Sequence, residues 1–168
     1  MNAFALTGND WNDANGPCCG VLACAIATQT KFADAWAWFK GKHNYCASYR
    51  WKGRTYNHWY KDYLDHAGVK HDYLDDIALH RKGWFDKTLI NFSRTAAEKD
   101  TAYLISTTGH AQVLYNGNVV DQDGVAPITK FWGKLKKIRN IYVIHGIDKD
   151  NIDNLVFGLP LFDAANKQ

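Results

Sequence analysis

Apolar residues in the first hundred positions of the chain recur mainly at the spacing of amphipathic helices. Small and apolar side chains fall three and four residues apart after Pro17, a residue that suits the first turn of a helix. Gly41 and Gly68 end two further segments with this period. The helices that this pattern predicts cover residues 17–29, 32–40, 55–67 and 88–97, with a short strand at 69–74.

Beyond residue 100 the pattern changes to short runs that are rich in β-branched and aromatic residues. These runs predict strands at 102–107, 111–115, 119–120 and 138–144. The pair Asn116-Gly117 separates the second run from the third and is a strong signal for a two-residue hairpin turn. Because helices come first and an antiparallel sheet follows, the predicted fold class is α+β rather than a sandwich of βαβ units.

Composition agrees with one compact domain. The chain has 168 residues, of which 46% are hydrophobic and 22% charged, in the ordinary range for a globular protein. We expect a single domain over 1–147 and a C-terminal tail over 148–168 that packs on the domain or is partly disordered. No apolar run approaches the roughly 20 residues of a membrane span, and the polar stretch 1–16 lacks the apolar region of a signal peptide. We therefore expect a cytoplasmic protein with no membrane partner.

The net charge of +3 is too small to indicate a nucleic-acid-binding protein by itself. One cluster of cations without a carboxylate surrounds the start of the last predicted strand. It consists of Lys130, Lys134, Lys136, Lys137 and Arg139. We interpret this cluster as a solvated face, so nucleic acid is not the expected partner.

The four cysteines are Cys18, Cys19, Cys24 and Cys46, and their spacing contains no Cys-x-x-Cys pair. We interpret them as free thiols in a reducing compartment. His43-x-x-Cys46 has a metal-like spacing, but no second pair completes a set of four ligands. We expect neither a metal nor a cofactor.

Cys19 lies in the first turn of the first predicted helix. Unpaired N–H groups and the positive end of the helix dipole stabilise a thiolate at such a position. A free cysteine is otherwise a small buried hydrophobic residue, and the position alone leaves both interpretations open. Cys18 would cap the helix, whereas Cys24 lies about 140° around it from Cys19 and is expected in the core.

A thiolate nucleophile needs a general base, and the base needs an acceptor that orients it. With a two-residue turn at Asn116-Gly117, Gln112 faces Asp121 and His110 faces Asp123 across the hairpin. Alternation then places all four side chains on one side of the sheet. Asp121, the diagonal neighbour of His110, is the favoured acceptor, and Asp123 beyond the strand end is the alternative. A three-residue turn would move Asp121 to the other face.

The segment CCGVLACAIAT at 18–28 resembles the opening Asp-Cys-x-x-x-Ala-x-Ala-x-Ala-Thr of a group of small phage-encoded papain-like proteins. Later segments resemble that group in their order of helix, strand, Gly-His strand, Gly turn and Asp. These segments are Thr88-Leu89, TAYLI at 101–105, Gly109-His110 and NGNVVD at 116–121. Cys18 departs from the pattern, because it stands where the group has Asp.

The resemblance implies a papain-like cysteine peptidase fold, with the nucleophile helix packed on an antiparallel β-sheet. It implies that Cys19 is the nucleophile, His110 the base and Asp121 the residue that orients the base. Papain-like enzymes commonly build the oxyanion hole with a Gln or Asn about six residues before the nucleophile. That position holds Asp13 here, so Asn12 or Asn15 is expected to substitute.

The expected function is hydrolysis of an amide, peptide or isopeptide bond through an acyl-enzyme. The substrate would be a peptide, a protein or a cell-wall peptide, and the location the host cytoplasm if the chain is phage-encoded. The alternative is a catalytically inactive papain-like scaffold of phage origin that binds or inhibits a host protein. A third hypothesis is nucleic-acid binding through the basic stretch 130–139.

Overall fold

The computed structural model describes residues 18–43, 51–148 and 152 of the chain. Within these residues it contains five helices and a six-stranded antiparallel sheet, so the predicted α+β class is confirmed. The helices are α2 (Cys19–Thr28), α3 (Phe32–His43), α4 (Asn57–His66), α5 (Asp76–Arg81) and α6 (Leu89–Thr95). The strands are β1 (His71–Leu74), β2 (Ala102–Thr107), β3 (His110–Tyr115), β4 (Asn118–Asp121), β5 (Gly124–Pro127) and β6 (Ile138–Ile144).

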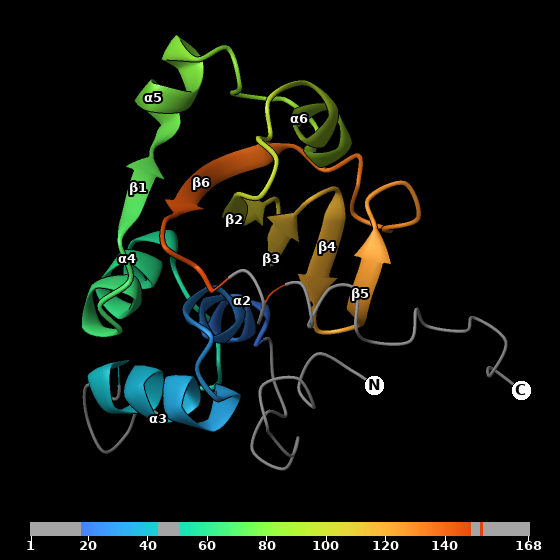
Figure 1. Cartoon of the computed structure of the whole chain (residues 1–168). Coiled ribbons are helices and arrows are strands. Elements are labelled where there is room, and N and C mark those ends of the chain that lie inside the picture. Colours follow the sequence, from blue (N-terminus) through green and yellow to red (C-terminus); the bar gives the residue numbers. More distant parts are fainter. Residues whose placement is uncertain (1–17, 44–50, 149–151, 153–168) are drawn as a thin grey trace, which may run out of the picture.

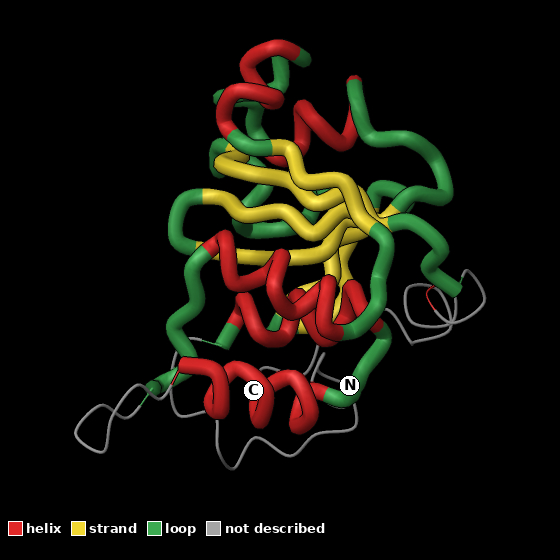
Figure 2. Tube along the Cα trace, turned by 90° about the vertical axis from the view of Figure 1, so that its left-hand side faces the viewer, coloured by secondary structure: helices red, strands yellow, loops and turns green. Residues whose placement is uncertain are grey.

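The sheet has the strand order β1-β6-β2-β3-β4-β5 and separates two groups of helices. Figure 1 shows α2, α3 and α4 on one side of the sheet, and α5 and α6 on the other. Helix α2 lies between the sheet and α3 (Figure 2). Its residues from Gly20 to Ala27 are all buried, which makes it the central helix of this layer.

The start of α2 is packed closely by the segment that leads into α4. A Cβ atom on Gly20 would overlap the hydroxyl of Thr55 and the ring and hydroxyl of Tyr60. These two hydroxyl groups are hydrogen-bonded to each other at 3.0 Å. Glycine therefore fits at position 20, directly after Cys19, where any larger residue would displace its neighbours.

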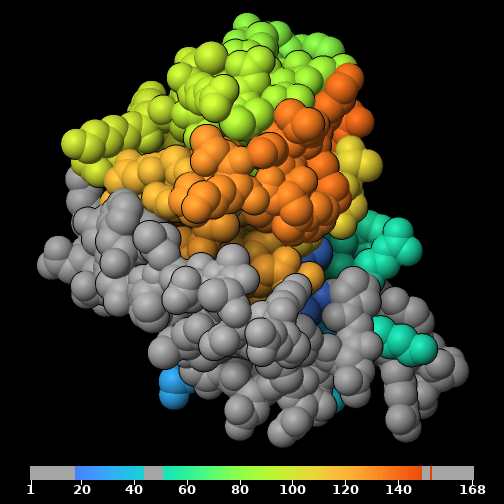
Figure 3. Space-filling model, turned by 90° about the vertical axis from the view of Figure 1, so that its right-hand side faces the viewer, coloured from blue at the N-terminus to red at the C-terminus, as the bar shows by residue number. Residues whose placement is uncertain are grey.

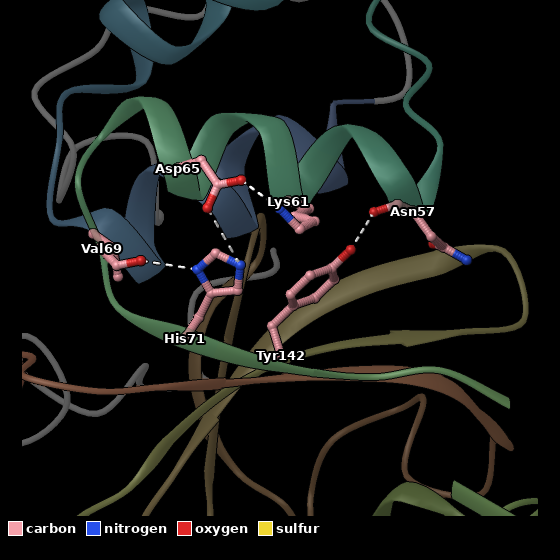
Figure 4. Close-up of polar contacts among 6 residues, drawn as sticks. All are labelled: Asn57, Lys61, Asp65, Val69, His71 and Tyr142. Carbon is pink, nitrogen blue, oxygen red and sulfur yellow. Dashed lines mark hydrogen bonds and ion pairs between the residues drawn. The ribbon is translucent and has the colours of Figure 1, made fainter. Parts of the chain in front are cut away.

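Helix α4 is held against the sheet at both ends (Figure 4). At its start, the hydroxyl of Tyr142 in β6 donates a hydrogen bond of 2.7 Å to the backbone carbonyl of Asn57. At its end, His71 of β1 lies 3.8 Å from the carboxylate of Asp65. The second ring nitrogen of His71 is hydrogen-bonded to the carbonyl of Val69 at 2.8 Å. These contacts hold α4 in place against the sheet, next to the start of α2.

The hairpin of β3 and β4 has the predicted two-residue turn. Tyr115 pairs with Asn118, Leu114 with Val119 and Val113 with Val120. The turn residues Asn116 and Gly117 have φ angles of 45° and 74°, as a type I′ turn requires. The register that places His110 and Asp121 on one face is therefore confirmed.

Side chains of β3 alternate between two apolar clusters on opposite faces of the sheet. Ala111, Val113 and Tyr115 belong to the cluster formed with α2, α3 and α4. Leu114 belongs to the cluster beneath α5 and α6. By alternation, His110 and Gln112 share the face of Leu114, which is the face away from α2.

Two elements were not predicted from the hydrophobic pattern. Helix α5 has six residues, of which Leu79 alone is buried, so it is too short to show a helical period. It is stabilised at its start by the Asp75 carboxylate, which accepts a hydrogen bond of 2.9 Å from the backbone N–H of Ala78. Strand β5 pairs with β4 at the edge of the sheet, where its Pro127 is tolerated.

The predicted tail begins in contact with the domain. The side chain of Gln29 donates a hydrogen bond of 3.1 Å to the carbonyl of Asp148, and Ile152 is buried in the cluster around α2. The rest of the predicted tail, 149–151 and 153–168, lies outside the described residues. Among the helices that the structure describes, none is long and apolar enough to cross a membrane.

Candidate active site

Cys19 is the first residue of α2, and its thiol is partly exposed. The helix carries no side-chain cap at its start, so the N–H groups of its first turn are available. The neighbouring Cys18 is 1% exposed, and Cys24 is fully buried in the core as predicted. Of the three cysteines within the described residues, Cys19 alone is accessible.

His110 is the first residue of β3 and meets Cys19 at the end of the sheet. Although α2 packs on the opposite face of β3, the His110 ring lies close enough to the thiol of Cys19 to lower its pKa, and both residues line the same groove. The backbone N–H of Ala111, the next residue, also lowers the pKa of this thiol. The contact is possible because His110 lies at the first position of the strand, beside the turn at Thr108-Gly109.

Asp121 binds the far side of the His110 ring. Its Oδ2 atom lies 2.9 Å from Nε2 of His110, and both side chains are almost fully buried. Its Oδ1 atom accepts a second hydrogen bond of 2.9 Å from the backbone N–H of Asp123. Because an imidazole has two nitrogens and Nε2 is used here, Nδ1 is the ring nitrogen left to interact with Cys19. Asp123 itself is exposed and contributes its backbone to this arrangement.

Electrostatics favour a charged thiolate–imidazolium pair. Burial opposes ionisation of Cys19, but hydrogen bonds from His110 and Ala111, the charge of His110 and the N–H of Gly20 together lower the pKa of the thiol. Burial likewise opposes the charge on His110, yet its hydrogen bonds to Asp121 and Cys19 and their negative charges raise its pKa to about 9. Burial and the charge of Cys19 raise the pKa of Cys18 to about 11, so the two adjacent thiols differ sharply.

Two aromatic rings cover the His110 side of the site. The ring centroid of Phe131 lies 6.2 Å from that of His110, and the centroid of Trp132 lies 5.1 Å away. Trp132 is 56% exposed, and the ammonium group of Lys136 lies 4.3 Å from its ring centroid. These residues come from the loop between β5 and β6 and pack beside the His110 ring.

Cys19 and His110 open into a groove of about 590 Å³. One wall comes from the start of α4 and the segment before it, and the other from the β2–β3 hairpin and the start of β6. In Figure 3 the start of α2, in blue, reaches the surface between the teal segment before α4 and the orange segments of the sheet. The described lining residues are Cys19, Arg54, Thr55, Tyr56, Asn57, Tyr60, Ser106, Thr107, Thr108, Gly109, His110, Ala111 and Arg139.

The α4 wall brings polar groups to the groove that the sequence did not single out. The hydroxyl of Ser106 donates a hydrogen bond of 2.9 Å to Oδ1 of Asn57. This bond leaves the NH₂ group of Asn57 as a donor beside the groove. Nothing in the sequence marks Asn57, because its position beside the groove depends on the contact between the start of α4 and Ser106 near the end of β2. The predicted oxyanion residues Asn12 and Asn15, together with Asp13, lie outside the described residues.

No cluster of three or more His, Cys, Asp or Glu side chains within the described residues is suited to hold a metal ion.

No protein-family model matches the chain, and no curated protein or solved structure matches it significantly. The chemistry of the site must therefore be inferred from its own geometry.

Proposed function

We propose that this chain is a papain-like thiol hydrolase that cleaves an amide, peptide or isopeptide bond. The observation that carries the proposal is the buried Asp121–His110 hydrogen bond of 2.9 Å, with Cys19 at a helix start in the same groove and its thiol pKa lowered by this ring. This is the nucleophile, base and orienting acceptor that covalent acyl transfer requires. The resemblance of segment 18–28 to small phage-encoded papain-like proteins supports the same assignment.

In the proposed reaction the Cys19 thiolate attacks the carbonyl carbon of the scissile amide. The imidazolium of His110 then gives its Nδ1 proton to the leaving amine, and an acyl-enzyme thioester remains on Cys19. Neutral His110 next takes a proton from water, which attacks the thioester and releases the acid. Asp121 keeps Nε2 protonated and thus keeps Nδ1 directed at the sulfur and the reacting atoms.

Pulse labelling of the thiols tests the assignment of the nucleophile. A brief, low dose of iodoacetamide near neutral pH, followed by peptide mass spectrometry, should modify Cys19 well before the other cysteines. Cys18→Ala is the matched control, since it removes the adjacent buried thiol and should leave the labelling of Cys19 unchanged. If Cys46 or Cys18 reacts first, or if all four thiols react at one slow rate, Cys19 is not the nucleophile.

His110→Ala tests the base. We expect it to slow the labelling of Cys19 by at least tenfold and to abolish alkylation by a peptidyl acyloxymethyl ketone probe, whose carboxylate leaves when the thiolate attacks, with an unchanged circular dichroism spectrum. An unfolded His110→Ala protein would indicate instead a histidine that is buried for structure. Rapid alkylation of Cys19 without any acylation or hydrolysis across a peptide and isopeptide library would favour the inactive, protein-binding scaffold.

A further inference from the structure

The charged side chains among the described groove residues are all of one sign. Arg54 lies on the α4 side and Arg139 on the sheet side, with His110 between the two walls. No Asp or Glu is found among the described residues that line the groove. Cys19 therefore lies in a groove whose positive potential comes from the two arginines as well as from the imidazolium of His110.

Arg139 is placed at the groove by a β-bulge. In the ladder between β2 and β6, Ser106 pairs with Asn140 but the next residue, Thr107, pairs with Ile138. Arg139 is consequently the extra, unpaired residue of β6. Ile138 and Ile141 both belong to the cluster beneath α5 and α6, so the bulge breaks the alternation between them. Such bulges redirect a side chain, and here the redirected side chain is a cation that lines the same groove as Cys19.

Neither guanidinium is neutralised by a strong ion pair. Within the described part of the chain, no carboxylate lies within ion-pair distance of Arg54, whose guanidinium carbon is 5.8 Å from the ring centroid of Tyr56. Arg139 has Asp86 at 3.5 Å, but Lys137 shares the same carboxylate oxygen at 3.5 Å and all three side chains are substantially exposed. Such exposed contacts contribute little and are readily exchanged for a ligand.

The rim of the groove adds further positive charge. Lys136, which lies over the ring of Trp132, donates a hydrogen bond of 3.1 Å to the backbone carbonyl of Thr108. The basic cluster that the sequence shows at 130–139 therefore begins at the edge of the groove. A cationic groove with two available guanidinium groups is complementary to carboxylates, which arginine binds in a bidentate fashion.

We infer that the groove selects an acidic peptide, in which a carboxylate within a few residues of the scissile amide binds Arg54 and Arg139. This inference rests on the proposed thiol hydrolase function and adds the substrate class. The carboxylate belongs either to an Asp or Glu side chain or to a free peptide C-terminus. Both present the same group to the two arginines.

Charge-selective alkylation of Cys19 tests the inference without a known substrate. Iodoacetate and iodoacetamide share a leaving group and differ in charge, so the ratio of their rate constants reports the potential at the thiol. In the double variant Arg54→Gln/Arg139→Gln we expect this ratio to fall about three- to tenfold, as the loss of two exposed charges implies. The control Arg81→Gln/Arg94→Gln removes the same charge from exposed sites on α5 and α6 and should leave the ratio unchanged.

Protection experiments then identify the carboxylate. The peptides acetyl-Gly-Glu-Gly-amide, acetyl-Gly-Gln-Gly-amide and acetyl-Gly-Gln-Gly with a free C-terminus are compared as protectants of Cys19 against iodoacetamide. Protection by the first alone assigns an acidic side chain, and protection by the third assigns a terminal carboxylate. Equal protection by all three, or protection by a single-stranded oligonucleotide alone, overturns the inference.

The outcomes separate the inference from the function on which it rests. If Cys19 reacts rapidly but the ratio is the same in both double variants, the hydrolase proposal stands and the acidic-peptide subsite is wrong. If Cys19 reacts slowly with both reagents, the hydrolase proposal itself fails.

Discussion

Replacing Asp121 tests how the proposed base is held. Its carboxylate accepts one hydrogen bond from His110 Nε2 and one from the backbone N–H of Asp123, each 2.9 Å long. Asp121→Ala removes both acceptors and the negative charge. Asp121→Asn keeps an oxygen that can accept from His110 but removes the charge. Because His110 is 7% exposed and Asp121 4% exposed, bulk water does not replace the lost partner.

The structure sets the size of the expected effect. A hydrogen bond that involves a charged group contributes about 1.5–3 kcal/mol, against about 0.5–1.5 kcal/mol for a neutral one. The pKa of His110, about 9 against an ordinary 6.5, corresponds to about 3 kcal/mol in favour of the imidazolium, shared between Asp121 and Cys19. Asp121→Ala should therefore raise the pH at which Cys19 becomes reactive by about one to two pH units, and Asp121→Asn by less than one.

The assay is the rate constant of Cys19 alkylation from pH 4.5 to 9.5, read by quenched labelling and mass spectrometry. The midpoint is the pH at which the rate constant reaches half of its maximum. At pH values below the midpoints of both proteins, Asp121→Ala should react about 10- to 100-fold more slowly than the wild-type protein. Asp123→Ala is the matched control, because it removes an exposed carboxylate and keeps the backbone N–H that binds Asp121. Equal midpoints for wild type and folded Asp121→Ala would refute the reasoning, and so would an Asp123→Ala midpoint raised by the same amount.

Three further predictions concern the surroundings of the site. Gly20→Ala should lower the free energy of unfolding in urea by about 1–3 kcal/mol and slow alkylation of Cys19, whereas Gly41→Ala, where a Cβ meets nothing within 4 Å, should do neither. Trp132→Ala should relieve part of the burial that opposes the charge on His110 and so raise the pKa of His110 measured by NMR, and Leu135→Ala on the same loop, at 69% exposed, should not. The folded pKa of His110 is raised, so its stabilising contribution is present in full below about pH 6.5 and is lost as the pH rises through about 9. The difference in unfolding free energy between wild type and His110→Ala should thus shrink between pH 6 and 9.5, and a difference that grows would contradict the assignment.

The part of the site that lies within one hairpin could be predicted from the sequence. Asn116-Gly117 specifies a two-residue turn, because Asn and Gly adopt the positive φ angles that such a turn needs. The turn fixes the register, and the register together with strand alternation places His110 and Asp121 on one face. Each step depends on local geometry, so no knowledge of the rest of the fold was required.

The approach of Cys19 to His110 could be expected from the chemistry of the two residues and from the resemblance of segment 18–28, but not from the hydrophobic pattern. Alternation along β3 places His110 on the face away from α2, and nothing in the hydrophobic pattern brings the helix start to the end of this strand. Their contact depends on how α2 packs across Ala111 and Val113, over 90 residues away in the chain. Sequence patterns report which side of an element is buried, but they do not report where two elements cross.

Arg139 shows a different limit of the sequence. The run 138–144 was predicted as a strand with the observed bounds, and Arg139 was assigned to a solvated basic face. The bulge that redirects Arg139 into the groove arises from a mismatch between β2 and β6, and no Gly or other turn residue marks it. Part of the basic stretch thus borders the groove, which the pattern of charges alone could not indicate.

The place of His110 at the end of its strand explains how one ring contacts partners from both layers of the fold. Two residues further along the same face, Gln112 is fully buried, and neither atom of its amide has a hydrogen-bond partner within the described part of the chain. A ring at that depth would be separated from α2 by the sheet, because Ala111 and Val113 occupy the face toward the helix. The short turn at Thr108-Gly109 therefore contributes to this arrangement, because it ends the sheet beside His110. We expect a β2–β3 hairpin longer by one residue pair to extend the sheet past His110 and to weaken the interaction of the imidazole with Cys19 more than its hydrogen bond to Asp121.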